Sequence, residues 1–166
     1  MADSDKPQII TPPNTLKDKV AIGGPNAVDL DALERAEQVI ANMADSYLDW
    51  VEEDLRKISA TYDRLVAGSD DRETDLKRVF EVAHDMKGQG GSFGFELITA
   101  VANNLCRLLE RFDDSTKHQV QNEAVRIHID AMKLIISSRM RGDGGEQGTA
   151  ILNGVQQMVE KLVPVK

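Results

Sequence analysis

Apolar residues recur at intervals of three and four positions along most of this chain from residue 29 onward. One such series ends at Gly68. Its members are Val51, Leu55, Ile58, Tyr62 and Leu65. This spacing places side chains on one face of an α-helix, because a helix completes a turn in about 3.6 residues. No segment shows the alternating pattern, bounded by hairpin signals, that is typical of a β-strand. The chain is therefore predicted to be all-α.

The apolar series divide into four helices of about 16–24 residues joined by short turns, which predicts an antiparallel up-down four-helix bundle. We expect the core of this bundle at about residues 46–140, within a domain that spans residues 29–163. An additional N-terminal helix is expected to start at Asp29, and a short C-terminal helix to span 149–163. Whether residues 30–67 form one helix or two stays open. No proline or glycine separates the two parts, but a bend near Asp45 is compatible with the pattern.

Proline and glycine mark the segments between the predicted helices. Residues 1–28 contain four prolines and the Gly23–Gly24 pair and show no sustained periodicity, so they are predicted to form a flexible tail. The sequence DDSTK at 113–117 predicts a turn, and RGDGGEQG at 141–148 predicts a flexible break.

The net charge of −8 limits the classes of partner. Nucleic-acid affinity depends on Lys and Arg that neutralise phosphates, so an acidic chain suits neither nucleic acid nor an anionic membrane surface. The sequence shows no apolar segment of signal-peptide length at its N-terminus, and no apolar run reaches the roughly 20 residues that span a bilayer. We therefore expect a cytoplasmic protein with no nucleic-acid or membrane partner. No second apolar face is evident, which favours a monomer.

The segment AHDMKGQGGSFGF at residues 83–95 interrupts a good helical pattern with glycines. Each glycine inside a helix costs roughly 1 kcal/mol relative to alanine. On a helical wheel, the nearby His84 lies about 100° from the centre of the apolar stripe, at the boundary with solvent. The same flank carries Lys77, Phe80, Lys87, Gly88 and Gly91.

Lys87 and Gly88 lie three and four positions after His84, which are the spacings of neighbouring side chains on a helix. If the imidazole of His84 accepted a phosphoryl group, the Lys87 ammonium would be a counter-charge for its oxygens. Gly88 removes the side chain that would crowd the imidazole, so that a partner's active site could approach closely. The glycines are thus predicted to provide clearance around a reactive histidine. An isolated H-x-x-K-G pattern, in contrast, would favour a polar surface histidine beside a helix that ends at Gly88.

The larger pattern resembles the signature of histidine-containing phosphotransfer (HPt) domains. That signature has a histidine, a lysine three positions on, a glycine four on, an apolar residue nine on and a glycine ten on. The matching residues here are His84, Lys87, Gly88, Phe93 and Gly94. The number and order of helices over about residues 46–140 are similar to that family as well. One departure is Gln89, where the family usually has a small residue; the wheel points this side chain away from His84.

The resemblance implies that His84 carries a phosphoryl group, that Lys87 helps to hold it and that Gly88 gives a response-regulator receiver domain room to dock. The chain would carry the group between receiver aspartates in a multistep two-component phosphorelay that includes a hybrid or phosphorelay histidine kinase. It would act as a stoichiometric phosphocarrier rather than as an enzyme. No cofactor or metal is expected on this chain, and Mg²⁺ would come from the receiver. Because the sequence has no G-x-x-x-x-G-K-[ST] loop, no ATP-binding kinase domain is expected.

Lys77, Phe80 and Gly91 would belong to the partner-binding surface, although a core role for Phe80 is equally compatible with the pattern. The other two histidines lack the Lys-Gly context. His118, in a predicted turn, and His128, beside an apolar stripe, are expected to have surface or packing roles. The single cysteine, Cys106, is expected in the core.

Three other readings stay open. A non-catalytic adaptor of the same shape would bind receiver or kinase domains without being phosphorylated, but it has no need for the His-Lys-Gly set. A histidine kinase dimerisation domain can also have an acidic residue after its histidine, but would require a longer chain with a nucleotide-binding domain. A plain structural bundle with a helix-ending glycine loop is the third reading.

Overall fold

The computed structural model describes residues 29–68, 70–113 and 115–163. The helices in these ranges are α2 (Leu30–Ala67), α3 (Arg72–Gly90), the short 3₁₀ helix η1 (Gly91–Phe93), α4 (Glu96–Leu109), α5 (His118–Ser137) and α6 (Gly145–Leu162). The same ranges contain no strand, and the predicted all-α class is confirmed. None of these helices is long and apolar enough to cross a membrane. The predicted flexible tail, residues 1–28, lies outside the described residues.

Helix α2 is one continuous helix, which decides between the two possibilities that the sequence left open. It begins as predicted at Asp29, whose side chain accepts a hydrogen bond from the Ala32 amide at 3.0 Å. The segment predicted as an additional N-terminal helix is the first part of α2, because no proline or glycine interrupts its backbone hydrogen bonds. After Ala67 the backbone turns left-handed at Gly68, with φ of 83°. Contacts divide the described residues into two units, one up to residue 39 and one from residue 40 onward, and the bundle belongs to the second.

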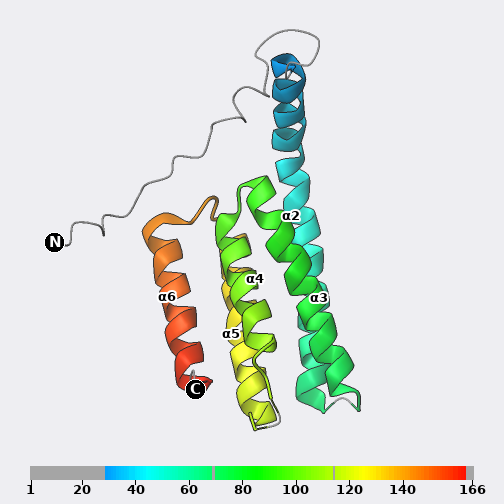
Figure 1. Ribbon diagram of the computed structural model, residues 1–166, viewed down its shortest axis with the longest axis vertical. Coiled ribbons are helices and arrows are strands. Elements are labelled where there is room, and N and C mark those ends of the chain that lie inside the picture. The colour runs from blue at the N-terminus through cyan, green and yellow to red at the C-terminus, as the bar shows by residue number, and fades with distance from the viewer. Residues whose placement is uncertain (1–28, 69, 114, 164–166) are drawn as a thin grey trace, which may run out of the picture. The chain divides into compact units, whose positions relative to one another are not determined.

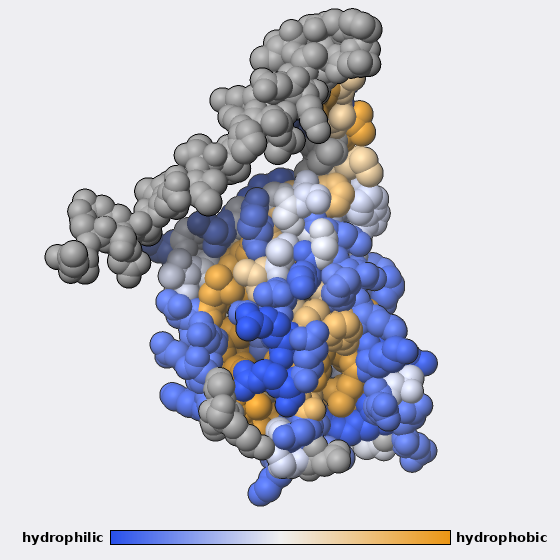
Figure 2. Space-filling view, in the orientation of Figure 1, coloured by the Kyte–Doolittle hydropathy of each residue, from blue (hydrophilic) through white to orange (hydrophobic). Residues whose placement is uncertain are grey.

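In the bundle, α3 packs against α4, α4 against α5, and α5 against α6. Figure 1 shows the chain reversing its direction between these successive helices. Their apolar faces form one core. Its largest fully buried side chains are Tyr47, Val51, Ile58, Met86, Phe95, Leu97, Ile98, Leu105, Leu108, His128, Met132 and Ile135. Figure 2 shows one face of the molecule, on which hydrophilic residues cover most of the described surface and hydrophobic residues show between them.

Helix α6 begins four residues earlier than the predicted start at 149, so the prediction of a flexible break was wrong for residues 145–148. Gly144 is left-handed, with φ of 70°, and the Asp143 side chain accepts a hydrogen bond from the Gly145 amide at 2.8 Å. Gly148 is buried, and a Cβ atom there would lie 1.9 Å from the Asp143 carbonyl oxygen. The glycines at this point therefore allow a tight helix start rather than a flexible segment.

The connection before α6 is fixed to the turn that follows α3 and η1. The Gly142 amide donates to the Gly94 carbonyl oxygen at 2.8 Å, and the Leu97 amide donates to the Gly142 carbonyl oxygen at 2.9 Å. The Arg141 guanidinium lies over the Phe95 ring, 5.1 Å from its centroid. These contacts hold the turn between the helix of His84 and α4 in place.

Candidate functional site

Helix α3 carries five of the six predicted site residues, and Gly91 follows as the first residue of η1. The helix starts at the Asp71 side chain, which accepts a hydrogen bond from the Thr74 amide at 3.1 Å. Val79, Ala83 and Met86 face the core. The flank that the sequence assigned to the site is thus the boundary between this buried stripe and solvent.

The imidazole of His84 is exposed. Within the described ranges it forms no hydrogen bond or ion pair, and its specific contact is with the Phe80 ring one turn earlier. The two ring centroids lie 5.9 Å apart, and the ring planes are inclined by 24°. Both residues line a shallow hollow together with Glu81 and Asp85. A ring in this position presents its nitrogen atoms to an incoming partner without first breaking an internal bond.

Lys87 is half-buried on the same flank, in the last turn of α3. Among the described residues no carboxylate lies within ion-pair distance of its ammonium. On α4, burial raises the pKa of the Cys106 thiol, and the Lys87 charge opposes that shift. The thiol is therefore protonated at neutral pH and does not neutralise Lys87, which leaves a positive charge beside His84.

Gly88 is exposed, and a Cβ atom built on it would meet nothing within 4 Å. The space next to His84 is therefore open on its C-terminal side. Lys77 is also exposed on this flank. Gly91 is exposed, and its added Cβ atom would lie 3.8 Å from the Thr99 hydroxyl, an ordinary contact distance.

Gly90 has a different role from the predicted clearance around His84. It is buried, and an added Cβ atom would lie 2.7 Å from the Thr99 hydroxyl oxygen and 2.9 Å from the Phe95 carbonyl oxygen. This glycine allows α3 and α4 to approach closely. The clearance predicted for the glycines as a group does not apply to Gly90, which lies in the buried stripe of α3 and packs against α4.

Thr99 is a site residue that the sequence analysis missed. Its hydroxyl donates to the Lys87 carbonyl oxygen at 3.1 Å and accepts from the Gly91 amide at 2.9 Å. The hydroxyl thus satisfies two backbone groups where α3 ends and fixes the end of the helix to α4. The spacing of Thr99, nine positions after Gly90 and eight after Gly91, is not a known sequence signal for such a contact.

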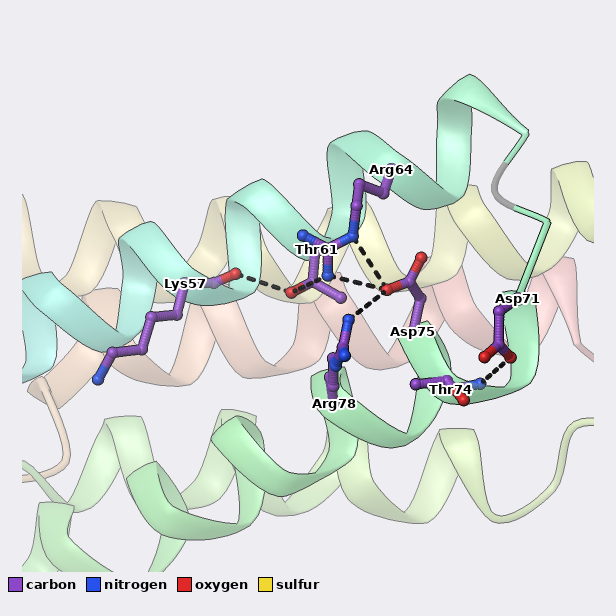
Figure 3. A network of polar contacts seen from close by, with 7 residues as sticks. All are labelled: Lys57, Thr61, Arg64, Asp71, Thr74, Asp75 and Arg78. Carbon is purple, nitrogen blue, oxygen red and sulfur yellow. Dashed lines mark hydrogen bonds and ion pairs between the residues drawn. The ribbon is translucent and has the colours of Figure 1, made fainter.

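The first turns of α3 are anchored to α2 by the buried Asp75 (Figure 3). Its Oδ1 atom accepts hydrogen bonds from Nε and Nη2 of Arg64 at 3.1 and 2.8 Å, and Nη1 of Arg78 lies 3.5 Å away. Arg64 also donates to the Thr61 hydroxyl at 3.2 Å. This network places α3 against α2, so that the His84 flank faces away from the core.

Aromatic residues of α2 cover the other end of α3. Tyr47 stacks on Phe93 with centroids 4.8 Å apart, and Trp50 meets the same ring edge-on at 5.9 Å. Burial and the Asp54 charge raise the pKa of Tyr47 to about 12, so its hydroxyl stays protonated. Trp50 remains 44% exposed and lines a second hollow that includes Gln89. The Gln89 side is thus the α2 side of the helix.

The other two histidines lie away from this flank. His118 is exposed. It was predicted to lie in a turn, but it is the first residue of α5. His128 is buried, and its Nδ1 atom is 2.8 Å from the Ala124 carbonyl oxygen. Burial lowers the pKa of His128, so this ring is neutral and packs in the core, as predicted. Cys106 is likewise buried, as expected.

Comparison with known proteins gives a family for most of the chain. The family model described as "Hpt domain" matches residues 42–161. No curated protein and no solved structure matches this chain.

Proposed function

Because this chain belongs to the Hpt domain family, we propose that it carries a phosphoryl group on His84 between receiver-domain aspartates of a multistep phosphorelay. Hpt domains act in phosphotransfer of two-component systems and are phosphocarriers rather than kinases. The assignment to His84 rests on three features that share one helix flank. The imidazole is exposed and has no polar contact in the described ranges, no carboxylate in those ranges neutralises Lys87, and the space at Gly88 is open.

The transfer step needs little from this chain beyond position and charge. The lone pair of an imidazole nitrogen attacks the phosphorus of the receiver's acyl phosphate. A P–N bond forms, the P–O bond to the aspartate breaks, and the aspartate leaves as a carboxylate. The other imidazole nitrogen keeps its proton. The reverse sequence passes the group to a second receiver.

Lys87 would stabilise the phosphoryl oxygens during and after this step, since a charge-assisted hydrogen bond to a phosphate is among the stronger polar contacts. Mg²⁺ would be supplied by the receiver, and the kinase upstream would be a hybrid or phosphorelay histidine kinase. The docking surface would include Lys77, Phe80 and Gly91, which lie on the flank of His84. Gly88 would let the receiver's active site come close to the imidazole.

A phosphotransfer assay tests this function. Wild type, His84→Gln and the control His118→Gln, which removes another exposed histidine, are mixed with a labelled phospho-receiver and Mg²⁺. Acid-labile, base-stable label is expected on wild type and His118→Gln, and none on His84→Gln. Label on His84→Gln would assign a different acceptor. Binding of receivers without label on any of the three proteins would instead support the non-catalytic adaptor.

A further inference from the structure

Phe80 and His84 form a stacked pair within one helix. They are four positions apart, which places their side chains next to each other. The centroid distance of 5.9 Å and the inclination of 24° lie within the range of offset-stacked aromatic pairs. The imidazole therefore packs beside the phenyl ring in an offset-stacked arrangement.

The two rings differ in how firmly each is held. Phe80 is partly buried and packs against the hydrophobic core. His84 is exposed and, in the described part of the chain, has no hydrogen bond that would choose a rotamer for it. The phenyl ring is thus the fixed partner, and stacking on it is the specific contact that orients the imidazole.

We propose that Phe80 is a positioning residue for phosphotransfer, which acts by holding the His84 imidazole in the rotamer that presents its nitrogen to the receiver. This inference rests on the proposed function of His84. Within a helix, an unrestrained histidine divides its time between about two χ1 wells and about two χ2 orientations. Loss of the stack should therefore lower the competent population, and with it the transfer rate, by roughly two- to fourfold.

The role in positioning is separable from a role in docking. Phe80→Leu keeps an apolar side chain for the receiver and for the core but removes the aromatic face. With increasing phospho-receiver, we expect the maximal transfer rate of Phe80→Leu to fall by about two- to fourfold, from the rotamer count above, while the half-saturating concentration stays unchanged. Phe80→Tyr, which restores the ring, should recover the wild-type rate. Tyr62→Leu is the matched control, because it removes another partly buried aromatic ring, on the α5 side of α2.

Two readouts need no partner protein. Phosphoramidate, a small phosphodonor that releases ammonia as the new P–N bond forms, should label Phe80→Leu more slowly by the same factor. In ¹H NMR, the imidazole C–H protons of His84 should carry a ring-current shift in wild type and Phe80→Tyr, because they lie next to an aromatic ring. This shift should be lost in Phe80→Leu and kept in Tyr62→Leu.

These measurements distinguish a positioning role of Phe80 from a docking role. An unchanged maximal rate with a raised half-saturating concentration would make Phe80 a docking residue and overturn the positioning role. A lower rate without movement of the His84 resonances would overturn it as well, because the effect would not act through the imidazole. If neither donor labels wild type, the proposed function itself fails. The resonances would then still report whether the rings stack, so the two failures are distinguishable.

Discussion

At the scale of single residues, the site is defined by what its side chains leave unpaired. Buried polar groups in proteins are nearly always satisfied, but His84 and Lys87 lie at the surface boundary and keep their bonding capacity for a partner. In the described ranges no carboxylate competes for the Lys87 ammonium. The charge is thus available for the phosphoryl group that we propose His84 carries.

Removal of this charge should weaken the phosphorylated state. Hydrogen bonds to charged groups contribute about 1.5–3 kcal/mol, so Lys87→Gln should lower the equilibrium constant for phosphorylation by a phospho-receiver by roughly tenfold or more. Lys87→Arg should retain part of the effect. Lys133→Gln, which removes an exposed charge from α5, is the control. A Lys87→Gln protein that is phosphorylated as fully as this control would contradict the role of the ammonium.

Alanine substitutions at Gly88 and Gly90 should change the free energy of unfolding in opposite directions. Gly88→Ala should stabilise the fold by about 0.5–1 kcal/mol, because the exposed helical position has room for a methyl group. Gly90→Ala should destabilise it by about 1–2 kcal/mol, because its Cβ atom would press on Thr99 and the Phe95 backbone. Urea unfolding measures both changes. Equal changes in the free energy of unfolding for the two substitutions would contradict a close approach of α3 and α4 at Gly90.

Gly88→Ala should at the same time slow phosphotransfer, since the methyl group would occupy the space next to His84. A more stable but slower protein is thus the expected combination. If Gly88→Ala increased both the stability and the transfer rate, Gly88 would not act by leaving space next to His84.

At the scale of elements, α3 is held at both ends and leaves its central flank to solvent. The Asp75 network fixes the first turns to α2, and the Thr99 hydroxyl fixes the last turn to α4. Site geometry therefore depends on contacts one to three turns away from His84. Such contacts limit the freedom of the helix backbone that carries the imidazole.

Asp75→Asn tests this anchoring. The carboxylate is 3% exposed, whereas the Arg64 side chain is 47% exposed. Removing one partner of a fully buried pair costs about 3–5 kcal/mol, but solvent around Arg64 screens part of the interaction. We expect a loss of about 2 kcal/mol in the free energy of unfolding, measured with urea. A double-mutant cycle with Arg64→Gln should show coupling, and additive losses would contradict a direct interaction.

Much of this element-level structure could be predicted because each helix has a periodic apolar face. The helix class, the start at Asp29 and the boundary position of His84 follow from periodicity and from capping residues. Contacts between helices do not. The packing role of Gly90 and the bridge made by Thr99 depend on which surface of α4 meets α3. The start of α6 was missed because glycines also mark loops, and only the backbone angle at Gly144 and the Asp143 contact distinguish the two cases.

At the scale of the whole molecule, the buried His128 links the stability of the bundle to pH. Its pKa is lowered in the folded state by burial. The unfolded chain therefore binds a proton at a higher pH than the folded protein does. As pH falls below the ordinary histidine value of about 6.5, protonation favours the unfolded state until the folded-state pKa is passed.

The expected result is a decrease in wild-type stability between pH 7.5 and 5.5 that a His128→Gln protein lacks. The loss should be at most about 1.4 kcal/mol for each pH unit in that window. Thermal or urea unfolding at several pH values gives the two curves. His118→Gln, at an exposed position, should follow the wild-type curve. Parallel curves for wild type and His128→Gln would assign the pH dependence to other groups.

The half-exposed Trp50 beside Phe93 has a practical consequence. It is the single tryptophan of the chain. It belongs to α2 and contacts Phe93, which follows the helix that carries His84. Indole emission depends on whether the ring is in contact with water, so this side chain is a built-in optical reporter of this contact. Encounters with other proteins that cover or uncover it can be followed in real time on the unmodified chain, without attaching a dye near His84.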